Sequence, residues 1–505
     1  MILRPRRDDL RAITWGMGRI VLAVGLLMLI PLLTSLVCAE WDMAINFVIG
    51  MLSCLILWLV TESHRPKKRD LTWFQGLVVV SGGWLLATLF GAIPHWLSGH
   101  FQSFLDACFD IMSGYTATGL ITVQDLDHAA HGFNMWRHVL TYGGGLGIVV
   151  IALTFLFAGT AGAFRIYVGE GREEKILPNV VRSARAIWMI SLIYLVVFSS
   201  ALWLVLMREG MPAGRGFLHS LWLVMGAWAT AGFTPQSLNL MYYRSFTVEL
   251  VTLVIFVLGA VNFALHYAVW NGRRREILKN IEVRSFFVTV LLTTLLLAIG
   301  FVREGVYTDL TTFFRRGFYN LVSGHTGTGN TTVFSVAYFK EFGFLATFAV
   351  ITAMAIGGSA CSTASGFKGL RMGILFRSIR QEIRRIMSPE SAVVMEKVHH
   401  LRDIWLTGEV VRTAFLIILC YCAIYFAGAI LGMAYGYPPH VAFFDSVSAG
   451  SNTGLSAGMV GPTMPNLLKV YFIFSMWAGR LEFVSIFALV GFAGVLWRGR
   501  RARKT

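Results

Sequence analysis

Four short stretches, each placed between two long apolar segments, constrain this chain more than any other feature. Each is uncharged and centres on one glycine among small or hydroxyl residues: 113–120 on Gly119, 229–233 on Gly232, 326–330 on Gly329 and 451–455 on Gly454. A short amphipathic run precedes each stretch, and another long apolar segment follows it. This order of helix, short helix, glycine loop and helix predicts a pore built four times within one chain.

The apolar segments themselves define the class of protein. Runs of about 20 apolar residues, the length that crosses the hydrocarbon core of a bilayer, recur from end to end. Of the 505 residues, 56% are hydrophobic and only 14% are charged, whereas a soluble domain is about a quarter charged. The runs are continuous rather than alternating, which excludes a transmembrane β-barrel. We therefore expect an all-α polytopic membrane protein with about ten spans and four re-entrant pore helices.

The formal net charge of +16 has a membrane explanation. Basic residues cluster in the segments between apolar runs, at 4–11, 64–69, 165–185, 273–284, 368–402 and 498–504. Lys and Arg mark the cytoplasmic side of a membrane protein, so both termini are expected in the cytoplasm. Binding to nucleic acid is not needed to explain the charge.

The order of segments predicts five units. Residues 1–68 form a two-helix hairpin outside the fourfold pattern, and the pore repeats follow at 69–168, 169–272, 273–400 and 401–505. We expect continuous second spans at about 136–164, 246–270 and 467–497, and a broken one at 342–376, in the third repeat.

The four loops have the chemistry of a cation site. Irregular backbone at membrane depth is tolerated where it is buried or lines water, so four such loops indicate one central wet path. Each short helix would point the negative end of its dipole at that path, and carbonyl rings replace the hydration shell of a large monovalent cation. The predicted site residues are Thr116, Ala117, Thr118, Gly119, Ala229, Thr230, Ala231, Gly232, Thr326, Gly327, Thr328, Gly329, Ser451, Asn452, Thr453 and Gly454.

At these residues the chain resembles the Trk/Ktr/HKT superfamily of bacterial, fungal and plant potassium transporters. It looks most like the Trk membrane subunit, because the added N-terminal hairpin is typical of that branch. The resemblance covers the chain from about residue 70 onward and maps one filter glycine to each repeat. Glycine in the first filter accompanies potassium permeation in the family, whereas serine there accompanies sodium preference in some plant members. Gly119 therefore implies potassium.

The resemblance also implies a gate. The family breaks the second helix of its third repeat with a glycine-rich loop, which corresponds here to 356–368, and carries an arginine in the last helix, here Arg480. The implied gate residues are Gly357, Gly358, Ser359, Ser362, Thr363, Gly366, Lys368 and Arg480. Ala364 and Ser365 stand where relatives tend to have glycines, so a stiffer gate is expected. In the second filter, Ala231 lacks the hydroxyl present at Thr118, Thr328 and Thr453.

Several polar residues inside apolar runs allow more than one interpretation. An arginine within a span is costly and usually functional, so Arg480 is interpreted as an electrostatic barrier that contacts the gate loop or, alternatively, as a structural anchor to carbonyls. Three acidic residues near the outer mouth either concentrate cations or cap the pore helices: Asp106, Asp110 and Asp445. Four further features are expected to be structural: a helix-packing seam at 143–147, packing hydrogen bonds at Asn262 and His266, and a solvated His399-His400 pair.

These observations lead to one functional hypothesis and two alternatives. The hypothesis is potassium uptake across a bacterial inner membrane, with K⁺ as substrate and Rb⁺ accepted, no cofactor in this chain and no nucleic acid. The resemblance implies a homodimer and a cytosolic nucleotide-binding ring as regulator. No catalytic constellation is visible, so an enzyme is not expected. The alternatives are a cation transporter of other selectivity, coupled to Na⁺ or H⁺, and a non-transporting membrane sensor or assembly subunit.

Overall fold

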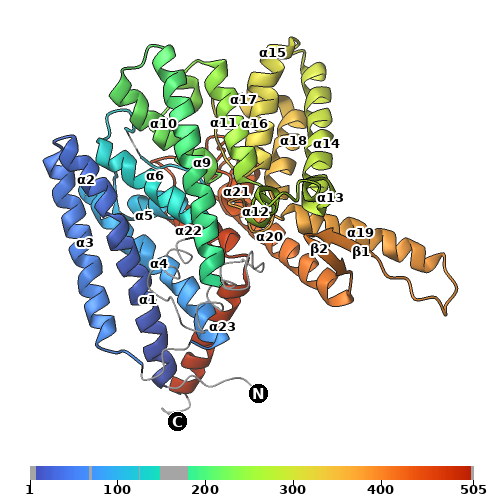
Figure 1. Ribbon diagram of the computed structural model, residues 1–505, viewed down its shortest axis with the longest axis horizontal. Coiled ribbons are helices and arrows are strands. Elements are labelled where there is room, and N and C mark those ends of the chain that lie inside the picture. Colours follow the sequence, from blue (N-terminus) through green and yellow to red (C-terminus); the bar gives the residue numbers. More distant parts are fainter. Residues whose placement is uncertain (1–6, 67–70, 124, 148–179, 502–505) are drawn as a thin grey trace.

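The computed structural model describes residues 7–66, 71–123, 125–147 and 180–501. Within them almost all regular structure is helical, as expected, and the strands β1 (Lys397–His400) and β2 (Arg402–Trp405) form one small antiparallel hairpin. The first helix begins and the last helix ends at the same end of the molecule (Figure 1). This common end agrees with an even number of crossings.

The N-terminal unit packs on the outside of the first repeat. It comprises α1 (Arg7–Leu27), α2 (Leu29–Val37) and α3 (Trp41–Glu62), and α1 packs along both α3 and α4 (Trp73–Leu97). At its turn, the Glu40 carboxylate accepts the main-chain N–H groups of His131 and Gly132 at 2.7 and 2.9 Å. These residues begin α6 (His131–Leu146), whose positive end favours a carboxylate. The turn is therefore joined to the first repeat.

The four repeats share one arrangement of helices. The first spans after α4 are α9 (Val180–Arg208), α14 (Ile281–Glu304) and α20 (Gly408–Ala434), and the pore helices are α5 (Phe104–Tyr115), α10 (Ala213–Trp228), α16 (Tyr319–His325) and α21 (Pro439–Gly450). In the third repeat, α15 (Leu310–Thr312) and the π-helical turn η2 (Phe313–Phe318) lead into α16. Ser103 caps α5 by accepting Asp106 N–H, and prolines begin α21. Pore helices α5 and α21 therefore begin at recognisable helix-start signals.

Two expected continuous spans are bent, so that part of the prediction was wrong. The second span of repeat two consists of α11 (Phe246–Gly259) and α12 (Phe263–Trp270), which meet at 96°. The last span consists of α22 (Asn466–Arg480) and α23 (Val484–Arg501), which meet at 118°. Both runs are predominantly apolar. Hydropathy gives no sign of a bend in either, because it reports composition and not backbone path.

The remaining second spans complete the set. The third repeat is broken as expected, into α18 (Gly343–Ile356) and α19 (Gly369–Ile386). In the first repeat α6 supplies the start of the expected span 136–164, and the rest of that range lies outside the described residues. Six helices of the described chain are long and apolar enough to cross a membrane, or eight with each bent pair as one span.

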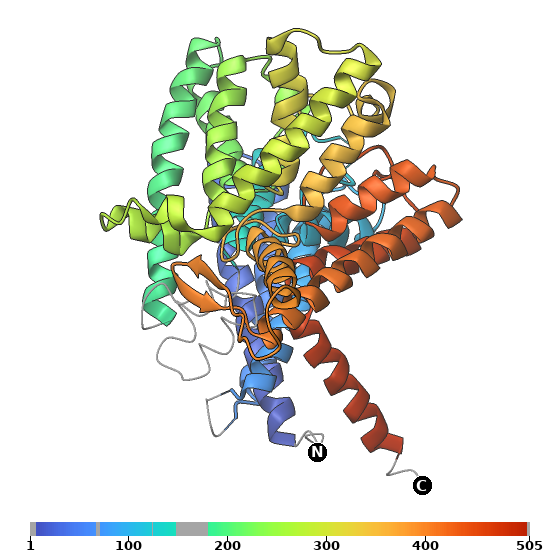
Figure 2. The ribbon, with the colours of Figure 1, turned by 90° about the vertical axis from the view of Figure 1, so that its right-hand side faces the viewer.

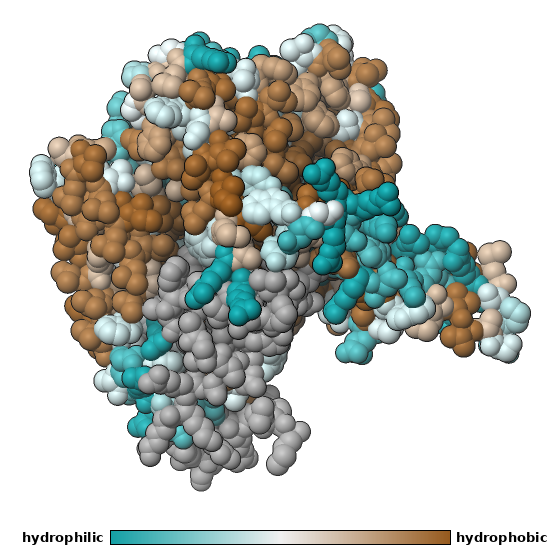
Figure 3. Space-filling model, viewed as in Figure 1, coloured by the Kyte–Doolittle hydropathy of each residue, from teal (hydrophilic) through white to brown (hydrophobic). Residues whose placement is uncertain are grey.

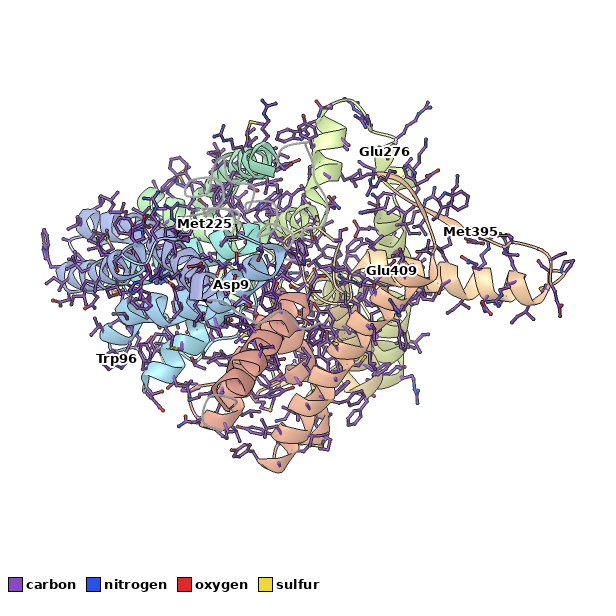
Figure 4. All side chains as sticks on the ribbon, turned by 90° about the horizontal axis from the view of Figure 1, so that it is seen from below. Asp9, Trp96, Met225, Glu276, Met395 and Glu409 are labelled. Carbon is purple, nitrogen blue, oxygen red and sulfur yellow. The ribbon has the colours of Figure 1, made fainter. Side chains whose placement is uncertain are left out.

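A polar appendage ends the third repeat. Helix α19 and the chain after it project from the helical body in Figure 1 and in the view from below, which labels Met395 on this projection (Figure 4). In Figure 2 this projection points toward the viewer. Short connecting elements complete the described fold: η1 (Asn239–Tyr242), α13 (Glu276–Lys279) and α17 (Ala337–Lys340). Large parts of the surface are apolar, as a lipid-facing surface requires, whereas α13, α19 and the hairpin region are hydrophilic (Figure 3).

The sequence predicted a solvated histidine pair at 399–400, and this prediction was wrong. His399 contacts Asp403 Oδ1 at 2.7 Å and Glu276 Oε2 at 3.0 Å through its two ring nitrogens. His400 is 3% exposed, and its Nδ1 lies 3.6 Å from Glu282 Oε2. The antiparallel register places His399 opposite Asp403, and the hairpin packs on α14. Tertiary packing, invisible in a basic sequence segment, accounts for the difference.

Candidate functional site

All four glycine loops leave their pore helix in the same way. The residue two positions before the central glycine has a positive φ in every loop: Ala117 at 54°, Thr230 at 49°, Gly327 at 70° and Asn452 at 55°. The next residue donates its N–H to the carbonyl five positions earlier: Thr118 to Ser113, Ala231 to Gly226, Thr328 to Ser323 and Thr453 to Ser448, at 2.8–2.9 Å. This is the Schellman ending of a helix. The negative ends of the four helices therefore lead into the loops.

The four central glycines touch one another in chain order. A Cβ placed on Gly119 would lie 2.5 Å from Gly232 N, and one on Gly232 would lie 2.7 Å from Gly329 O. A Cβ on Gly329 would overlap the carbonyl of Thr453, and one on Gly454 would overlap the carbonyl of Thr118. The contacts close into a ring, here called the glycine ring. Backbone atoms cannot rotate away, so only glycine fits at these positions.

Three of the loops repeat the same hydroxyl contacts. Paired side-chain hydroxyls lie 2.7–2.8 Å apart in the first, third and fourth loops: Thr116–Thr118, Thr326–Thr328 and Ser451–Thr453. Ser113 and Ser448 accept the N–H of Gly119 and Gly454, each at 3.0 Å. The second loop has Ala229 and Ala231 at the paired positions. It therefore lacks this hydroxyl pair and is held by other contacts.

Asn239 supplies one of those other contacts. Its side-chain Nδ2 donates to the carbonyl of Gly232 at 3.0 Å, and its Oδ1 accepts the N–H of Thr331 at 3.1 Å. Thr331 follows the third glycine loop, so one amide joins two neighbouring loops of the ring. Asn239 itself has φ +52°, a conformation that asparagine tolerates better than most residues.

The glycine ring forms the floor of a hollow of about 280 Å³. All four ring glycines line it, together with residues of the segments that follow each loop, including Thr331, Asn239 and Ser456. Its wall includes Arg137, which is buried, donates to Asp110 Oδ2 at 3.3 Å and lies 4.0 Å from the Phe233 ring. This hollow gives a hydrated ion room immediately next to the carbonyl-rich ring.

The three acidic residues expected near the outer mouth are buried and structural. Asp106 pairs with Lys469 Nζ at 2.5 Å, which joins the first and fourth repeats. Asp110 pairs with Arg137 at 3.3 Å. Asp445 accepts the N–H groups of Ala457, Met459 and Val460 at 2.5–3.2 Å. The described contacts therefore favour a scaffolding role over collecting cations from solution.

The segment 356–368, here called the inner loop, is closed at its base. Phe367 and Lys368 donate their N–H groups to the carbonyls of Ala355 and Ile356 at 3.0 and 2.8 Å. Gly357 and Gly366, with φ of +73° and +88°, allow the two ends to lie side by side. The expected gate residues Ser359, Ser362, Thr363 and Lys368 are all buried. The predicted break in this span is confirmed.

The inner loop satisfies the backbone groups that the bend between α11 and α12 leaves open. Ser359 N–H donates to the Ala260 carbonyl at 3.0 Å, and the Thr363 hydroxyl donates to the Gly259 carbonyl at 2.8 Å. The carbonyl of Cys361 accepts Phe263 N–H at 3.2 Å. Broken helices are tolerated at membrane depth when neighbouring protein supplies such partners. Bend and loop therefore form one joint unit.

Thr363 connects this unit to the glycine loops. Its hydroxyl lies 3.0 Å from that of Thr230, which belongs to the second loop. Its carbonyl accepts a hydrogen bond from Arg480 at 2.5 Å. The second guanidinium nitrogen of Arg480 donates to the carbonyls of Gly144 and Gly145 at 2.9 and 2.6 Å. The guanidinium of Arg480 thus contacts both the inner loop and the end of α6.

The expected glycine seam at 143–147 explains how α6 comes so close to the ends of the pore helices α5 and α10. A Cβ on Gly144 would overlap the carbonyl of Tyr115, and one on Gly145 would lie 2.8 Å from the Cβ of Ala229. The seam therefore packs against two pore-helix ends, as small residues allow. Asn262 and His266 also behave as expected, because Asn262 caps α12 and His266 bonds the Leu258 carbonyl at 3.0 Å.

Glu482 is a member of the site that sequence reasoning missed. Its carboxylate pairs with Lys368 and Arg371, at the start of α19. Glu482 has φ +52° and lies in the bend between α22 and α23, two residues after Arg480. A single acidic residue in an apolar run was a signal for a buried pair, but the partners lie more than a hundred positions away in sequence. Arg137 gave a comparable signal, because it is a charge inside the expected span 136–164, whereas Asn239 gave none.

Comparison with known proteins agrees with this architecture. A family model described as TrkH, cation transport protein, matches residues 44–493. The chain is 28% identical over 504 residues to an uncharacterized cation transporter of Methanocaldococcus jannaschii, covering 100% of this chain and 99% of that protein. It is 27% identical over 504 residues to the Trk system potassium uptake protein TrkH of Escherichia coli, covering 97% and 99%.

A solved structure shares the fold. The crystal structure of the potassium transporter TrkH from Vibrio parahaemolyticus aligns with a TM-score of 0.79 at 24% identity, covering 95% of this chain and 98% of that one. Because the family model extends over nearly the whole of it, this chain belongs to the TrkH family of cation transport proteins.

Proposed function

We propose that this chain takes up K⁺ across a bacterial inner membrane, with the glycine ring as its selectivity filter. The closed backbone contacts of Gly119, Gly232, Gly329 and Gly454 carry this proposal. They place four carbonyl-rich loops at one point, next to a hollow that admits a hydrated ion. Carbonyl oxygens at the ring replace the water that K⁺ loses on entry. The potassium uptake proteins among the relatives support the choice of ion.

Transport in this proposal follows one path. K⁺ enters the outer hollow, loses water at the glycine ring and reaches the inner loop, where Thr363 and Arg480 meet. A fixed positive charge below a carbonyl ring raises the energy of a cation there. Arg480 therefore slows passage while its guanidinium stays on Thr363. Movement of the inner loop away from this contact opens the path.

The regulator proposed for that movement is a cytosolic nucleotide-binding ring, and the proposed assembly is a homodimer. Helix α19 carries five arginines, at 371, 377, 380, 384 and 385, which pair with only three glutamates of the described chain, Glu482, Glu396 and Glu382. The net positive charge that remains supports a partner with negative charge. Glu482 holds Lys368 and Arg371, so α19 is tied directly to the bend that carries Arg480. Force on α19 would therefore reach the inner loop through a short, rigid connection.

Uptake of K⁺ and ⁸⁶Rb⁺ tests the proposal. The chain is expressed with its cytosolic partner in a bacterial strain that lacks its own potassium uptake, and uptake of K⁺, Na⁺ and an anion is compared. We expect growth on limiting K⁺, uptake of Rb⁺, weaker uptake of Na⁺ and none of the anion. Absence of uptake by well-expressed protein would overturn the transport proposal.

A further inference from the structure

A second hollow, of about 250 Å³, lies inside the bend between α11 and α12 and is here called the elbow pocket. Both arms of the bend contribute to its wall, with Val257 and Val261 from one arm and Leu265 and Val269 from the other. Helix α14 closes it with Phe286 and Phe287, and α9 with Tyr194. The wall is almost entirely apolar.

The elbow pocket opens toward the apolar surface of the protein. Three of its lining side chains are well exposed, namely Phe287 at 66%, Trp270 at 43% and Ile277 at 37%. The surface of α14 beyond Phe287 continues with the exposed Val288 and Leu291. An exposed apolar surface on a membrane-spanning helix faces lipid tails, so the pocket is accessible from the hydrocarbon of the bilayer.

Positive charge borders the same opening. Arg273, Arg274 and Arg275 begin three positions after the last residue of α12 and are all exposed. In sequence they lie between the pocket residues Trp270 and Ile277. The exposed Lys279 adds a fourth cation. The carboxylate of Glu276, labelled in Figure 4, is hydrogen-bonded to His399 at 3.0 Å. The cations and the pocket therefore lie on one short segment, which is hydrophilic beside the apolar body (Figure 3).

We propose that the elbow pocket binds one acyl chain of an anionic phospholipid whose headgroup lies on Arg273, Arg274 and Arg275. An apolar pocket alone does not choose among lipids, because the bilayer interior is as apolar as the pocket. Basic residues at the membrane surface attract anionic headgroups, so selection comes from the arginines and position from the pocket. The arginines lie next to the pocket along the chain, as the headgroup of a lipid lies next to its acyl chains.

Such a lipid would contact the inner loop. Ser359 lines the elbow pocket, and its N–H donates to the carbonyl of Ala260, another lining residue, at 3.0 Å. An acyl chain in the pocket therefore packs against the joint between the bend and the inner loop. This site goes beyond ion transport, and its occupancy is measurable without any ion flux.

Retention of defined lipids tests the proposal. The purified full-length protein is stripped of lipid in detergent, incubated with dioleoyl phosphatidylglycerol or dioleoyl phosphatidylcholine, and examined by native mass spectrometry after washing. We expect at least a fivefold preference for phosphatidylglycerol. Equal retention of the two lipids would overturn the proposal.

Two kinds of variant separate the parts of the site. Val261→Trp fills the pocket and Leu265→Phe narrows it, and either should reduce the retained phosphatidylglycerol several-fold in protein that remains monodisperse. Arg274→Gln with Arg275→Gln should abolish the preference over phosphatidylcholine. The matched control, Arg402→Gln with Arg412→Gln, removes the same charge from exposed positions elsewhere. This control should keep the preference for phosphatidylglycerol over phosphatidylcholine. Unchanged lipid retention in the pocket and arginine variants would overturn the proposal, because it would show that the lipid binds elsewhere on the protein.

Discussion

The guanidinium of Arg480 donates a hydrogen bond to the main-chain carbonyl of Thr363 at 2.5 Å, although the two residues are 117 positions apart. This contact joins the bend of the last span to the loop that interrupts the third repeat. It agrees with both sequence interpretations of Arg480, because the arginine is anchored to carbonyls and one of those carbonyls belongs to the inner loop.

Loss of the Arg480 guanidinium should increase ion flux. Arg480→Ala removes the charge and the bonds to Thr363, Gly144 and Gly145. A hydrogen bond to a charged group contributes about 1.5–3 kcal/mol, so we expect flux through proteoliposomes to rise about tenfold or more. Arg303→Ala, which removes an exposed arginine, is the control and should leave flux unchanged. Equal flux in wild type and Arg480→Ala would contradict the barrier.

The Thr363 hydroxyl should couple the inner loop to the second glycine loop. Thr363→Val and Thr230→Val each remove one partner of their 3.0 Å contact while keeping side-chain shape. A neutral hydrogen bond contributes about 1 kcal/mol, which corresponds to a several-fold loss of K⁺ preference over Na⁺ in each variant. The double variant should lose less than the two single effects combined, because both remove the same bond. Fully additive effects on selectivity would show that the contact does not couple the loops.

The glycine ring should tolerate no side chain. In Gly119→Ala the methyl group meets Gly232 N, and the backbone also stays at φ +96°. A positive φ costs a non-glycine residue about 1–2 kcal/mol, and the clash adds to this cost. We expect Gly119→Ala and Gly119→Ser to weaken K⁺ preference in competitive Rb⁺ and Na⁺ uptake.

Gly305→Ala is the matched control for the glycine ring. Gly305 has φ +67°, and a Cβ there meets nothing within 4 Å. The substitution therefore carries the backbone cost without the clash. It should lower thermal stability slightly and leave ion preference unchanged. Unchanged preference for K⁺ in the Gly119 variants would show that the selectivity filter does not lie at the glycine ring.

Asn239 should hold two of the loops in register. Asn239→Asp keeps the acceptor for Thr331 N–H but loses the donor to the Gly232 carbonyl. A main-chain carbonyl left without its partner costs about 1–3 kcal/mol. We expect reduced K⁺ preference in Asn239→Asp and a larger loss in Asn239→Ala, with surface expression as the control. Equal selectivity in wild type, Asn239→Asp and Asn239→Ala would show that Asn239 does not contribute to ion selection.

The hairpin after α19 should loosen as pH rises. Hydrogen bonds to Asp403 and then Glu276 raise the pKa of His399 above its usual value. A raised pKa in the folded protein means that the stabilisation is complete below about pH 6.5, the usual histidine pKa, and is lost as pH rises through the raised value. His399 is partly exposed, so the effect is below about 1 kcal/mol.

Hydrogen–deuterium exchange measures this effect. Protection of residues 397–405 is compared between wild type and His399→Gln at each pH, so that the intrinsic exchange rate cancels. We expect wild type to be better protected at pH 5.5 and the two proteins to converge at alkaline pH. A difference that grows with pH would contradict the assignment.

Local sequence determined the elements of this protein. Long apolar runs can only be buried in a bilayer or a core, and four uncharged glycine stretches between them specify four irregular loops at membrane depth. The small residues of 143–147 likewise specified close helix packing before any partner was known. These properties follow from composition and spacing, which are fully present in the sequence.

Tertiary structure decided how the elements meet. The apolar runs at 246–270 and 467–497 read as single spans, yet both bend, because the inner loop, Lys368 and Arg371 supply partners for groups in the two bends. Asn239 became a site residue only when folding brought it between Gly232 and Thr331. A hydrogen bond between distant residues depends on distances that hydropathy and spacing do not encode. For this reason the loops could be located from sequence, whereas the glycine ring and the Arg480–Thr363 contact required the fold.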